Sequence, residues 1–291
     1  MKKRRTIKKV LKGVPIIEGA GVHLKRPFGY HQVPDFDPFL MLDDFHSSDP
    51  ADYIAGFPWH PHRGIETITY IVEGIVEHRD SMGNQGIIGS GDVQWMTAGS
   101  GIVHQEMPQE SVTGSMRGFQ LWANLPASHK MMPPRYRDIK AADIKEVILD
   151  SGARVKVISG EFQGIRGPVI DIVIDPEFLD VLLPAGTVFT HQVKSGHTVF
   201  AYILDGEGYF DDSGDKGSSE DAYGPENAIL YEHEGESITV VAAGQGLRFL
   251  FVSGKPLHEP VAWRGPIVMN TEDELRIAFD EYKKGTFIKK N

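Results

Sequence analysis

Two short segments of the sequence each carry a pair of potential metal ligands with one residue between them. The first pair is His60 and His62, and the second is His104 and Glu106. Side chains two residues apart on a β-strand point to the same side, so each pair can face the interior of a barrel. Three imidazoles and one carboxylate suit Fe, Mn, Ni, Cu or Zn and leave coordination positions for water, substrate or oxygen.

The composition of the chain leaves nitrogen and oxygen as the ligands for such an ion. The 291 residues include 12 histidines and no cysteine, which excludes disulfides, thiolate metal sites and a cysteine nucleophile. A single His-x-His pair is common at protein surfaces, but two pairs among strands and glycines favour a shared site. Pro61 would weaken a central strand, whereas it is tolerated where a strand begins or at the rim of a barrel.

The histidines of the C-terminal half lack this spacing. His191 and His197 are six residues apart across an expected turn, and neither has a partner two residues away. We interpret them, together with His233 and His258, as structural or surface residues. We therefore expect no second metal site in that half.

Most of the chain shows the pattern of short β-strands. Apolar and β-branched runs of about four to eight residues alternate with turns that contain Gly, Asp or Asn. Closely spaced short strands are typical of a barrel or a sandwich. The runs expected to form strands include Thr67–Val72, Asp92–Met96, Gly118–Ala123, Val169–Ile174, Thr198–Leu204, Ser237–Ala242 and Leu247–Val252.

The pattern changes between Ser128 and Ser151. A Lys-Met-Met-Pro-Pro sequence that begins at Lys130 precedes a charged, alanine-containing stretch, which is typical of a connector with short helical pieces. We therefore expect an all-β protein with an N-terminal metal-binding barrel over residues 1–130. A connector over residues 131–150 and a second barrel over residues 151–291 would follow.

One helix is expected near the C-terminus. Thr271 and Glu274 have the spacing of a capping box, and a Lys-Lys-Gly sequence ends the segment at Gly285. Four apolar side chains share one face of this helix and should pack against a barrel surface. They are Leu275, Ala278, Phe279 and Tyr282.

The charge of the chain bears on its partners and location. A formal charge of −10 argues against direct binding to nucleic acid, because phosphate binding needs clustered positive charge. Seven of the first twelve residues are basic, and an edge strand protected by lysines explains them more simply than a localisation signal or an anionic contact. No stretch reaches the roughly 20 apolar residues of a membrane helix, and no signal-peptide core is present. We expect no membrane partner and a cytoplasmic protein or, in a eukaryote, a nuclear one.

The two ligand segments resemble the motifs of the cupin superfamily. The first motif, His-x-His followed by Glu and then Gly, is approximated by His60, His62, Glu66 and Gly74. In the second motif, Thr-Ala-Gly replaces the usual Pro-x-Gly. Its matching residues are Gly91, Asp92, Gly99 and His104.

Within this superfamily the chain is most similar to the pirin family, over essentially its whole length. The resemblance implies two antiparallel, jelly-roll-like cupin barrels packed as a bicupin, with metal only in the N-terminal barrel. The segments that carry it are Phe57–Glu66, Gln94–Gly99, His104–Pro108, Leu121–Asn124 and Gly265–Asn270.

The resemblance to pirin also implies the ligand set. Pirin's iron ligands fall on His60, His62, His104 and Glu106, so Fe(II) is the favoured ion, although Ni, Cu, Zn or Mn would suit the same ligands. In other cupins the carboxylate at the position of Glu66 is often a ligand. Because Glu66 follows His62 by four residues, we expect it to face inward. It would be an alternative ligand or would accept a hydrogen bond from a ligand imidazole.

Different classes of function are open. Pirins are similar to cupin quercetin 2,3-dioxygenases, which implies ring opening of a flavonol, a small planar polyphenol, with O2. In that reaction Glu106 would be the general base. Alternatively, the resemblance implies an iron- and redox-dependent regulator that binds a transcription factor or a metabolic enzyme without turnover. A metal-stabilised scaffold without chemistry is the third interpretation.

Several side chains near the ligands could shape a substrate site. Phe57, Trp59 and Trp95 could line an apolar slot for a flat polyphenol, or they could pack as core and rim of the barrel. Gln120 lies in a strand that is expected to pass the metal. We therefore include it as a residue that could support the ligands.

Overall fold

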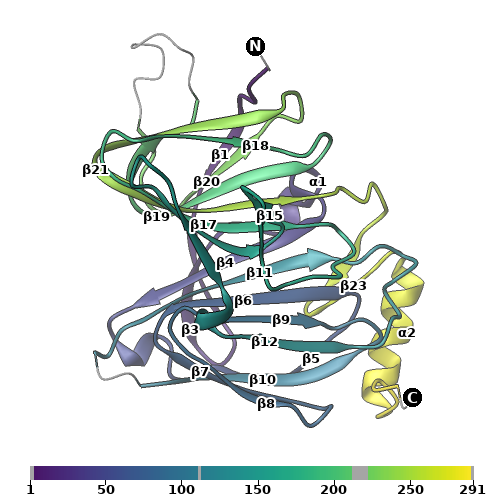
Figure 1. Cartoon of the computed structure of the whole chain (residues 1–291). Coiled ribbons are helices and arrows are strands. Elements are labelled where there is room, and N and C mark those ends of the chain that lie inside the picture. The colour runs from purple at the N-terminus through teal and green to yellow at the C-terminus, as the bar shows by residue number, and fades with distance from the viewer. Residues whose placement is uncertain (1–2, 111–112, 212–221, 290–291) are drawn as a thin grey trace. The chain divides into compact units, whose positions relative to one another are not determined.

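A computed structural model describes residues 3–110, 113–211 and 222–289 (Figure 1). The chain forms two compact units, and each is built from two separate segments. The first β unit consists of Val14–Ala141 and Leu257–Asn291, and the second β unit consists of Met1–Gly13 and Ala142–Pro256. Strand pairing within the named sheets is antiparallel throughout the described residues.

The first β unit contains two main sheets. The four-stranded sheet has the order β5 (Phe57–His62), β10 (Ile102–Gln109), β7 (Ile75–Asp80) and β8 (Gln85–Ile88). The seven-stranded sheet has the order β12 (Arg135–Ile139), β9 (Val93–Thr97), β6 (Ile65–Glu73), β11 (Met116–Asn124), β4 (Phe39–Ser47), β3 (Val22–Phe28) and β2 (Val14–Glu18).

Shorter elements complete the first unit. The hairpin of β22 (Ala262–Arg264) and β23 (Ile267–Met269) precedes the C-terminal helix α2 (Glu272–Lys283). The remaining helical turns are η1 (Tyr30–Gln32), α1 (Val33–Phe36) and η2 (Pro50–Asp52).

The second β unit is built around one large sheet. Its order is β1 (Ile7–Lys12), β20 (Asn227–Tyr231), β19 (Thr198–Tyr209), β21 (Ser237–Gly254), β17 (Glu177–Leu183), β14 (Arg154–Ser159) and β13 (Lys145–Ile148). β18 (Val188–Gln192) also pairs with β21, and β15 (Glu161–Phe162) pairs with β16 (Ile165–Arg166). The basic N-terminal segment thus contributes an edge strand, β1.

These units differ from the predicted ranges 1–130, 131–150 and 151–291. β1 belongs to the second unit because it pairs with β20, and Leu257–Asn291 belongs to the first unit. The predicted connector is shared: β12 pairs with β9 of the first unit and β13 pairs with β14 of the second. Only Ala141–Asp143 (η3) within it is helical. Strand pairing between distant segments decided the division, and a division by sequence order could not include it.

The predicted C-terminal helix is confirmed. The Thr271 hydroxyl accepts a hydrogen bond from the Glu274 backbone N–H, and the Glu274 carboxylate accepts one from the Thr271 N–H, which completes the capping box. Leu275 and Ala278 are buried in a small apolar cluster with Ile267 of β23 and other residues of the first unit. The helix therefore packs on its own unit's C-terminal hairpin.

The predicted strand at Val169–Ile174 is wrong. Beyond one isolated bridge between Ser159 and Val169, this segment forms turns and irregular structure. Within the segment, Asp171 has a positive φ angle of 60°, which a β-strand does not allow. Apolar composition alone did not reveal this break.

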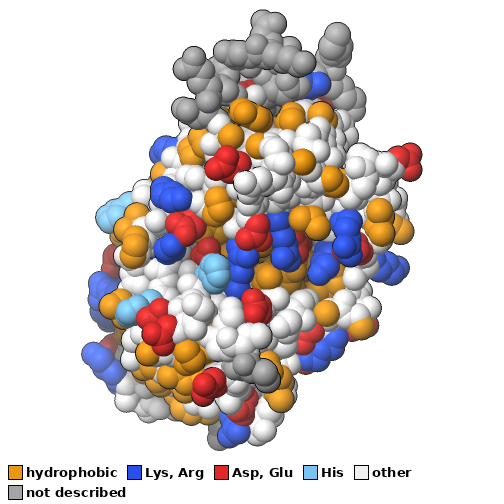
Figure 2. Space-filling model, turned by 90° about the vertical axis from the view of Figure 1, so that its left-hand side faces the viewer, with side chains coloured by type: hydrophobic (Ala, Val, Ile, Leu, Met, Phe, Trp, Pro, Cys, Tyr) orange, Lys and Arg blue, Asp and Glu red, His pale blue; other side chains and the backbone are white. Residues whose placement is uncertain are grey.

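Two observations concern membrane spans and surface charge. In the described part of the chain, no helix is long and apolar enough to cross a membrane. Figure 2 shows acidic and basic side chains next to one another on one face.

Candidate metal centre

The first potential ligands meet because β5 pairs with β10. His60 lies directly opposite His104, and His62 lies opposite Ile102. Alternation along both strands therefore brings the three imidazoles to one face. β5 is an edge strand of its sheet, so Pro61 removes no central hydrogen bond.

The three imidazole rings converge through their Nε2 atoms. The His60 Nε2 atom lies 3.1 Å from that of His62 and 2.9 Å from that of His104. His60 Nδ1 lies 2.8 Å from the Pro58 carbonyl oxygen, and His62 Nδ1 lies 3.0 Å from the Pro266 carbonyl oxygen. A carbonyl only accepts, so each Nδ1 carries the proton and each facing Nε2 presents a lone pair.

Two lone pairs at this separation repel each other unless a cation lies between them. Two nitrogens bound at right angles to one ion, each about 2.1 Å away, would be about 3.0 Å apart. Burial lowers the pKa of His60, and it lowers the pKa values of His62 and His104 further. The three imidazoles are therefore neutral near pH 7, as metal ligands must be. The donor set therefore fits a divalent transition metal.

Glu106 is held beside this cluster by two donors from the opposite sheet. The Thr69 hydroxyl donates to Glu106 Oε1 over 3.1 Å, and the Gln120 amide donates to Oε2 over 2.7 Å. The Trp122 indole N–H in turn donates to Gln120 Oε1 over 3.0 Å, which fixes the amide. Glu106 lies with His104 in a second potential ligand group rather than in the group of three imidazoles.

The third member of that second group is His78, which the sequence analysis missed. It lies on β7 directly opposite Glu106, is fully buried, and has its Nε2 atom 3.3 Å from Asp80 Oδ2. Among the described residues, the Nδ1 atoms of His78 and His104 have no hydrogen-bond partner. The spacing of His78 and Asp80, again two residues apart, was the signal that could have found it.

The C-terminal hairpin supports the site at several points. Besides the Pro266 carbonyl on His62, the Val268 carbonyl accepts a hydrogen bond from buried Lys130, which also bonds to Gly64 and Asn124. Gly64 has a φ of 78°, and a Cβ there would overlap the Val268 carbonyl oxygen. The turn between β5 and β6 thus requires glycine where the hairpin crosses it.

The expected inward orientation of Glu66 is wrong. Its carboxylate accepts hydrogen bonds from the Thr97 hydroxyl (2.6 Å) and the Trp95 indole (3.2 Å). Glu66 is three residues from Thr69 on β6, so it lies on the opposite face from the side that reaches Glu106. The turn at Gly64 interrupts the alternation that was counted from His62. Trp95 shares the face of Glu66 and so does not line the site.

A cavity of about 640 Å³ opens beside His60, His62 and Gln120. Phe57 lines it as expected, whereas Trp59 is exposed and lies outside its lining. Aromatic residues from distant segments that the sequence analysis did not propose complete the lining. They are Tyr30, Trp122 and Trp263.

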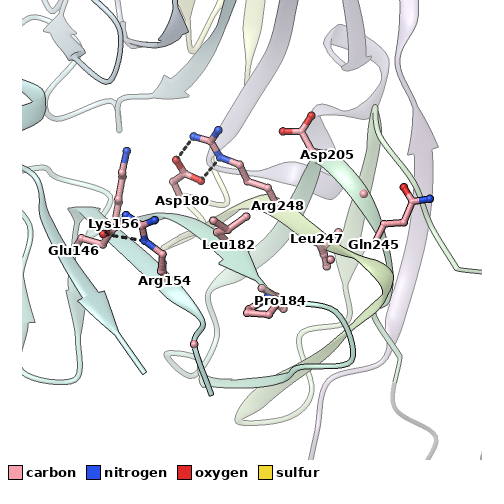
Figure 3. A pocket seen from close by; sticks show the side chains of 14 residues that line it. Glu146, Arg154, Lys156, Asp180, Leu182, Pro184, Asp205, Gln245, Leu247 and Arg248 are labelled. Carbon is pink, nitrogen blue, oxygen red and sulfur yellow. Dashed lines mark hydrogen bonds and ion pairs between the residues drawn. The ribbon is translucent and has the colours of Figure 1, made fainter. Parts of the chain in front are cut away.

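The second β unit also has a cavity, of about 650 Å³, but its lining differs (Figure 3). Arg154 pairs with Glu146, and Arg248 forms a two-bond ion pair with Asp180. None of the described residues that line it is a histidine. Elsewhere in this unit, buried His191 is bonded to Glu177 over 3.0 Å, which agrees with its structural interpretation.

Two antiparallel β units, one with a histidine cluster inside, define a protein of the cupin class. A family model named Pirin matches residues 21–123, and a model for the pirin C-terminal cupin domain matches residues 178–288. The chain belongs to the pirin family. The predicted fold class, all-β with two cupin domains and a short C-terminal helix, is confirmed.

Individual relatives extend this similarity. A pirin-like protein of Caulobacter vibrioides is 43% identical over 97% of this chain and 99% of its own length. A solved quercetin 2,3-dioxygenase from Acinetobacter baumannii is 31% identical, covers 98% of this chain and 99% of its own, and has a TM-score of 0.88. The bacterial pirin YhhW of Escherichia coli, solved in complex with nickel(II), is 21% identical, covers 85% of this chain and 99% of its own, and shares the fold with a TM-score of 0.64.

Proposed function

We propose that this protein is a metal-dependent dioxygenase that opens the heterocycle of a flavonol with O2. The observation that carries the proposal is the convergence of three neutral imidazoles beside a large cavity with aromatic walls. His60, His62 and His104 would hold the ion, with Glu106 as the fourth ligand. Fe(II) is our first choice of metal, and Ni(II) is the second because a solved pirin binds it.

When bound, the ion would supply the Lewis acidity that lowers the pKa of the flavonol 3-hydroxyl. Glu106 is the residue suited to take up the proton, because its carboxylate is buried and has a fixed orientation. The two bonds from Thr69 and Gln120 leave further lone pairs on both oxygens. Gln120 would thus act as a positioning residue for the base.

The cavity would bind the rest of the substrate. Trp122 and Trp263 present ring surface that suits a flat aromatic molecule and excludes water from the reacting end. The Pro266 carbonyl would keep His62 in the tautomer that presents Nε2 to the cavity.

The test is turnover by protein loaded with Fe(II) or Ni(II). Incubation with quercetin and O2 should consume the flavonol absorbance and release carbon monoxide. His62→Ala should abolish both, while His191→Ala, a buried histidine of the second unit, should retain them. Retained metal without turnover in the wild type would contradict the proposal. Capture of a protein partner by only one iron oxidation state would then favour the regulatory alternative.

A further inference from the structure

A row of polar side chains runs across one face of the first unit's seven-stranded sheet. Gln120 lies directly opposite Thr69 of β6 on one side and opposite Asp43 of β4 on the other. Residues directly opposite each other on paired strands share a face, so Asp43 lies on the same face as Thr69 and Gln120, which bond to Glu106. Arg26 of β3 extends the row through its bonds to Asp43.

This row ends in a group of three charged residues, Arg26, Asp43 and Glu18, whose summed charge is negative. Arg26 Nε and Nη2 donate to the two oxygens of Asp43 over 2.6 and 2.7 Å, and Nη1 donates to Glu18 over 3.1 Å. One guanidinium thus faces two carboxylates. Asp43 is almost fully buried, whereas the Glu18 side chain is 45% exposed. All three residues line the imidazole cavity, and their carboxylates offer acceptors to it.

Aromatic rings form a continuous apolar wall in the same cavity. The ring centroids of His62 and Trp122 are 4.9 Å apart, those of Trp122 and Trp263 are 5.8 Å apart, and those of Trp263 and Tyr30 are 5.6 Å apart. The wall begins at a metal-ligand candidate and ends at exposed Tyr30. A planar ring packed on this wall would have an edge available to polar groups across the cavity.

We propose that Glu18 and Asp43 select planar polyphenols by accepting hydrogen bonds from a hydroxyl other than the 3-hydroxyl, and that they reject compounds with a carboxylate at that position. This inference rests on the proposed function and adds its substrate selectivity. A hydroxyl donates to a carboxylate in a strong, charge-assisted bond. A substrate carboxylate would meet an uncompensated negative charge and could donate nothing.

Binding under argon separates this selectivity from turnover. Metal-loaded protein is titrated with quercetin, with 3-hydroxyflavone, which lacks the remote hydroxyls, and with 3-hydroxyflavone carrying a carboxylate on its pendant ring. Quenching of tryptophan fluorescence reports binding, since Trp122 and Trp263 line the cavity. We expect quercetin to bind about tenfold more tightly than 3-hydroxyflavone, as for one charge-assisted bond. The carboxylate compound should bind more weakly than either.

Glu18→Gln changes this pattern in two opposite directions. It should reduce the preference for quercetin about threefold and tighten binding of the carboxylate compound, because the excess charge is gone. Asp43→Asn should act in the same directions, and Trp263→Leu should weaken all three compounds together. Glu146→Gln, at the cavity of the second unit, is the matched control and should change nothing.

The outcomes separate the two proposals. Equal affinities for quercetin and 3-hydroxyflavone, or unchanged preferences in Glu18→Gln, would overturn the selectivity while leaving the dioxygenase proposal standing. If the expected binding preferences are found but no flavonol is turned over in air, the dioxygenase proposal is contradicted and the selectivity is supported. Failure of every flavonol to bind would overturn both.

Discussion

In the second β unit, one continuous apolar cluster of the described residues includes Phe189, Phe249 and Ile203. In the first β unit, the apolar clusters around Met96, Ile71 and Ile267 are smaller, and buried imidazoles lie near them. His78 and His104 are both fully buried there, and the Nδ1 atom of each has no hydrogen-bond partner among the described residues. Two units of similar β architecture thus fill their interiors differently.

The two kinds of side chain contribute differently to stability. Apolar burial stabilises by about 25 cal/mol per Å², whereas a buried polar group without a partner costs about 1–3 kcal/mol. Buried imidazole nitrogens without a partner therefore lower the stability of the first unit relative to apolar side chains in the same places. An ion between the imidazoles would offset part of that cost.

A related ion pair occurs beside the cavity of each unit. Asp43 accepts two bonds from Arg26 in the first unit, and Asp180 accepts two from Arg248 in the second (Figure 3). Among the described lining residues of these two cavities, histidines occur in that of the first unit alone. The pair by itself therefore does not make a reactive site, and the convergence of imidazoles distinguishes the two.

The largest expected effect is loss of the metal. His104→Ala should reduce bound metal from about one equivalent to none, because it removes a ligand that two other imidazoles face. His191→Ala in the second unit should leave the metal content unchanged. Metal analysis of protein purified without chelating resin checks both. Equal metal in the two variants would place the ion elsewhere.

Truncation of a buried side chain in the second unit should lower stability and leave the metal content unchanged. Phe249 is fully buried in the continuous cluster, so Phe249→Ala should lower the free energy of unfolding by about 3–5 kcal/mol. Metal content should stay at that of the wild type. Urea unfolding and metal analysis of the same preparations measure the two quantities. Metal loss in a folded Phe249→Ala protein would show that the units are not independent in this respect.

Removal of the metal should destabilise the first unit selectively. An ion present at a hundred times its dissociation constant stabilises the native state by about 3 kcal/mol. After chelation we expect faster hydrogen exchange in β5 and β10, with little change in β17 and β21 of the second unit. Uniform acceleration over both units would argue against a local stabilising role.

The smallest expected effect is a pH dependence at Asp43. Burial raises the pKa of Asp43 from 3.8 to about 6, although the ion pair with Arg26 acts to lower it. The pKa of Arg26 is also raised, because the effect of its carboxylate partners is larger than the effect of its burial. Between pH 4 and 6 the native state keeps a proton that the unfolded chain has lost. Stability should therefore fall as pH rises through this window, by on the order of 2 kcal/mol.

Asp43→Asn tests this pH dependence. The variant should flatten the slope of unfolding free energy between pH 4 and 6, and Asp180→Asn should keep it. Urea denaturation at several pH values provides the measurement. A wild-type slope that survives in Asp43→Asn would assign the effect to another group.

The sequence predicted those parts of the site that depend on strand alternation. His60 and His62 share a face because β5 is regular between them, and His104 joins them by direct pairing. The same counting failed for Glu66, because the turn at Gly64 lies between it and His62. Alternation can be read from sequence only within one uninterrupted strand.

The domain limits and the cavity could not be predicted in this way. Leu257–Asn291 follows the second unit in the chain but packs on the first, where the Pro266 carbonyl bonds to His62 and Trp263 lines the cavity. Local composition carries no information about which sheet a late segment will cover. His78 was missed for a related reason, since its proximity to Glu106 depends on pairing of β7 with β10.

The sequence by itself determined the chemistry that is available: a cysteine-free chain with paired histidines, an all-β pattern and one capped helix. The tertiary structure alone decided which groups meet. It placed the Nε2 atom of His60 within 3.1 Å of the Nε2 atoms of His62 and His104. It also joined Glu106 to Gln120 by a hydrogen bond and directed the Glu66 carboxylate to Thr97 on the other face of the sheet. The physical reason is that residue type and strand period are local properties, whereas convergence depends on long-range pairing between strands far apart in the chain.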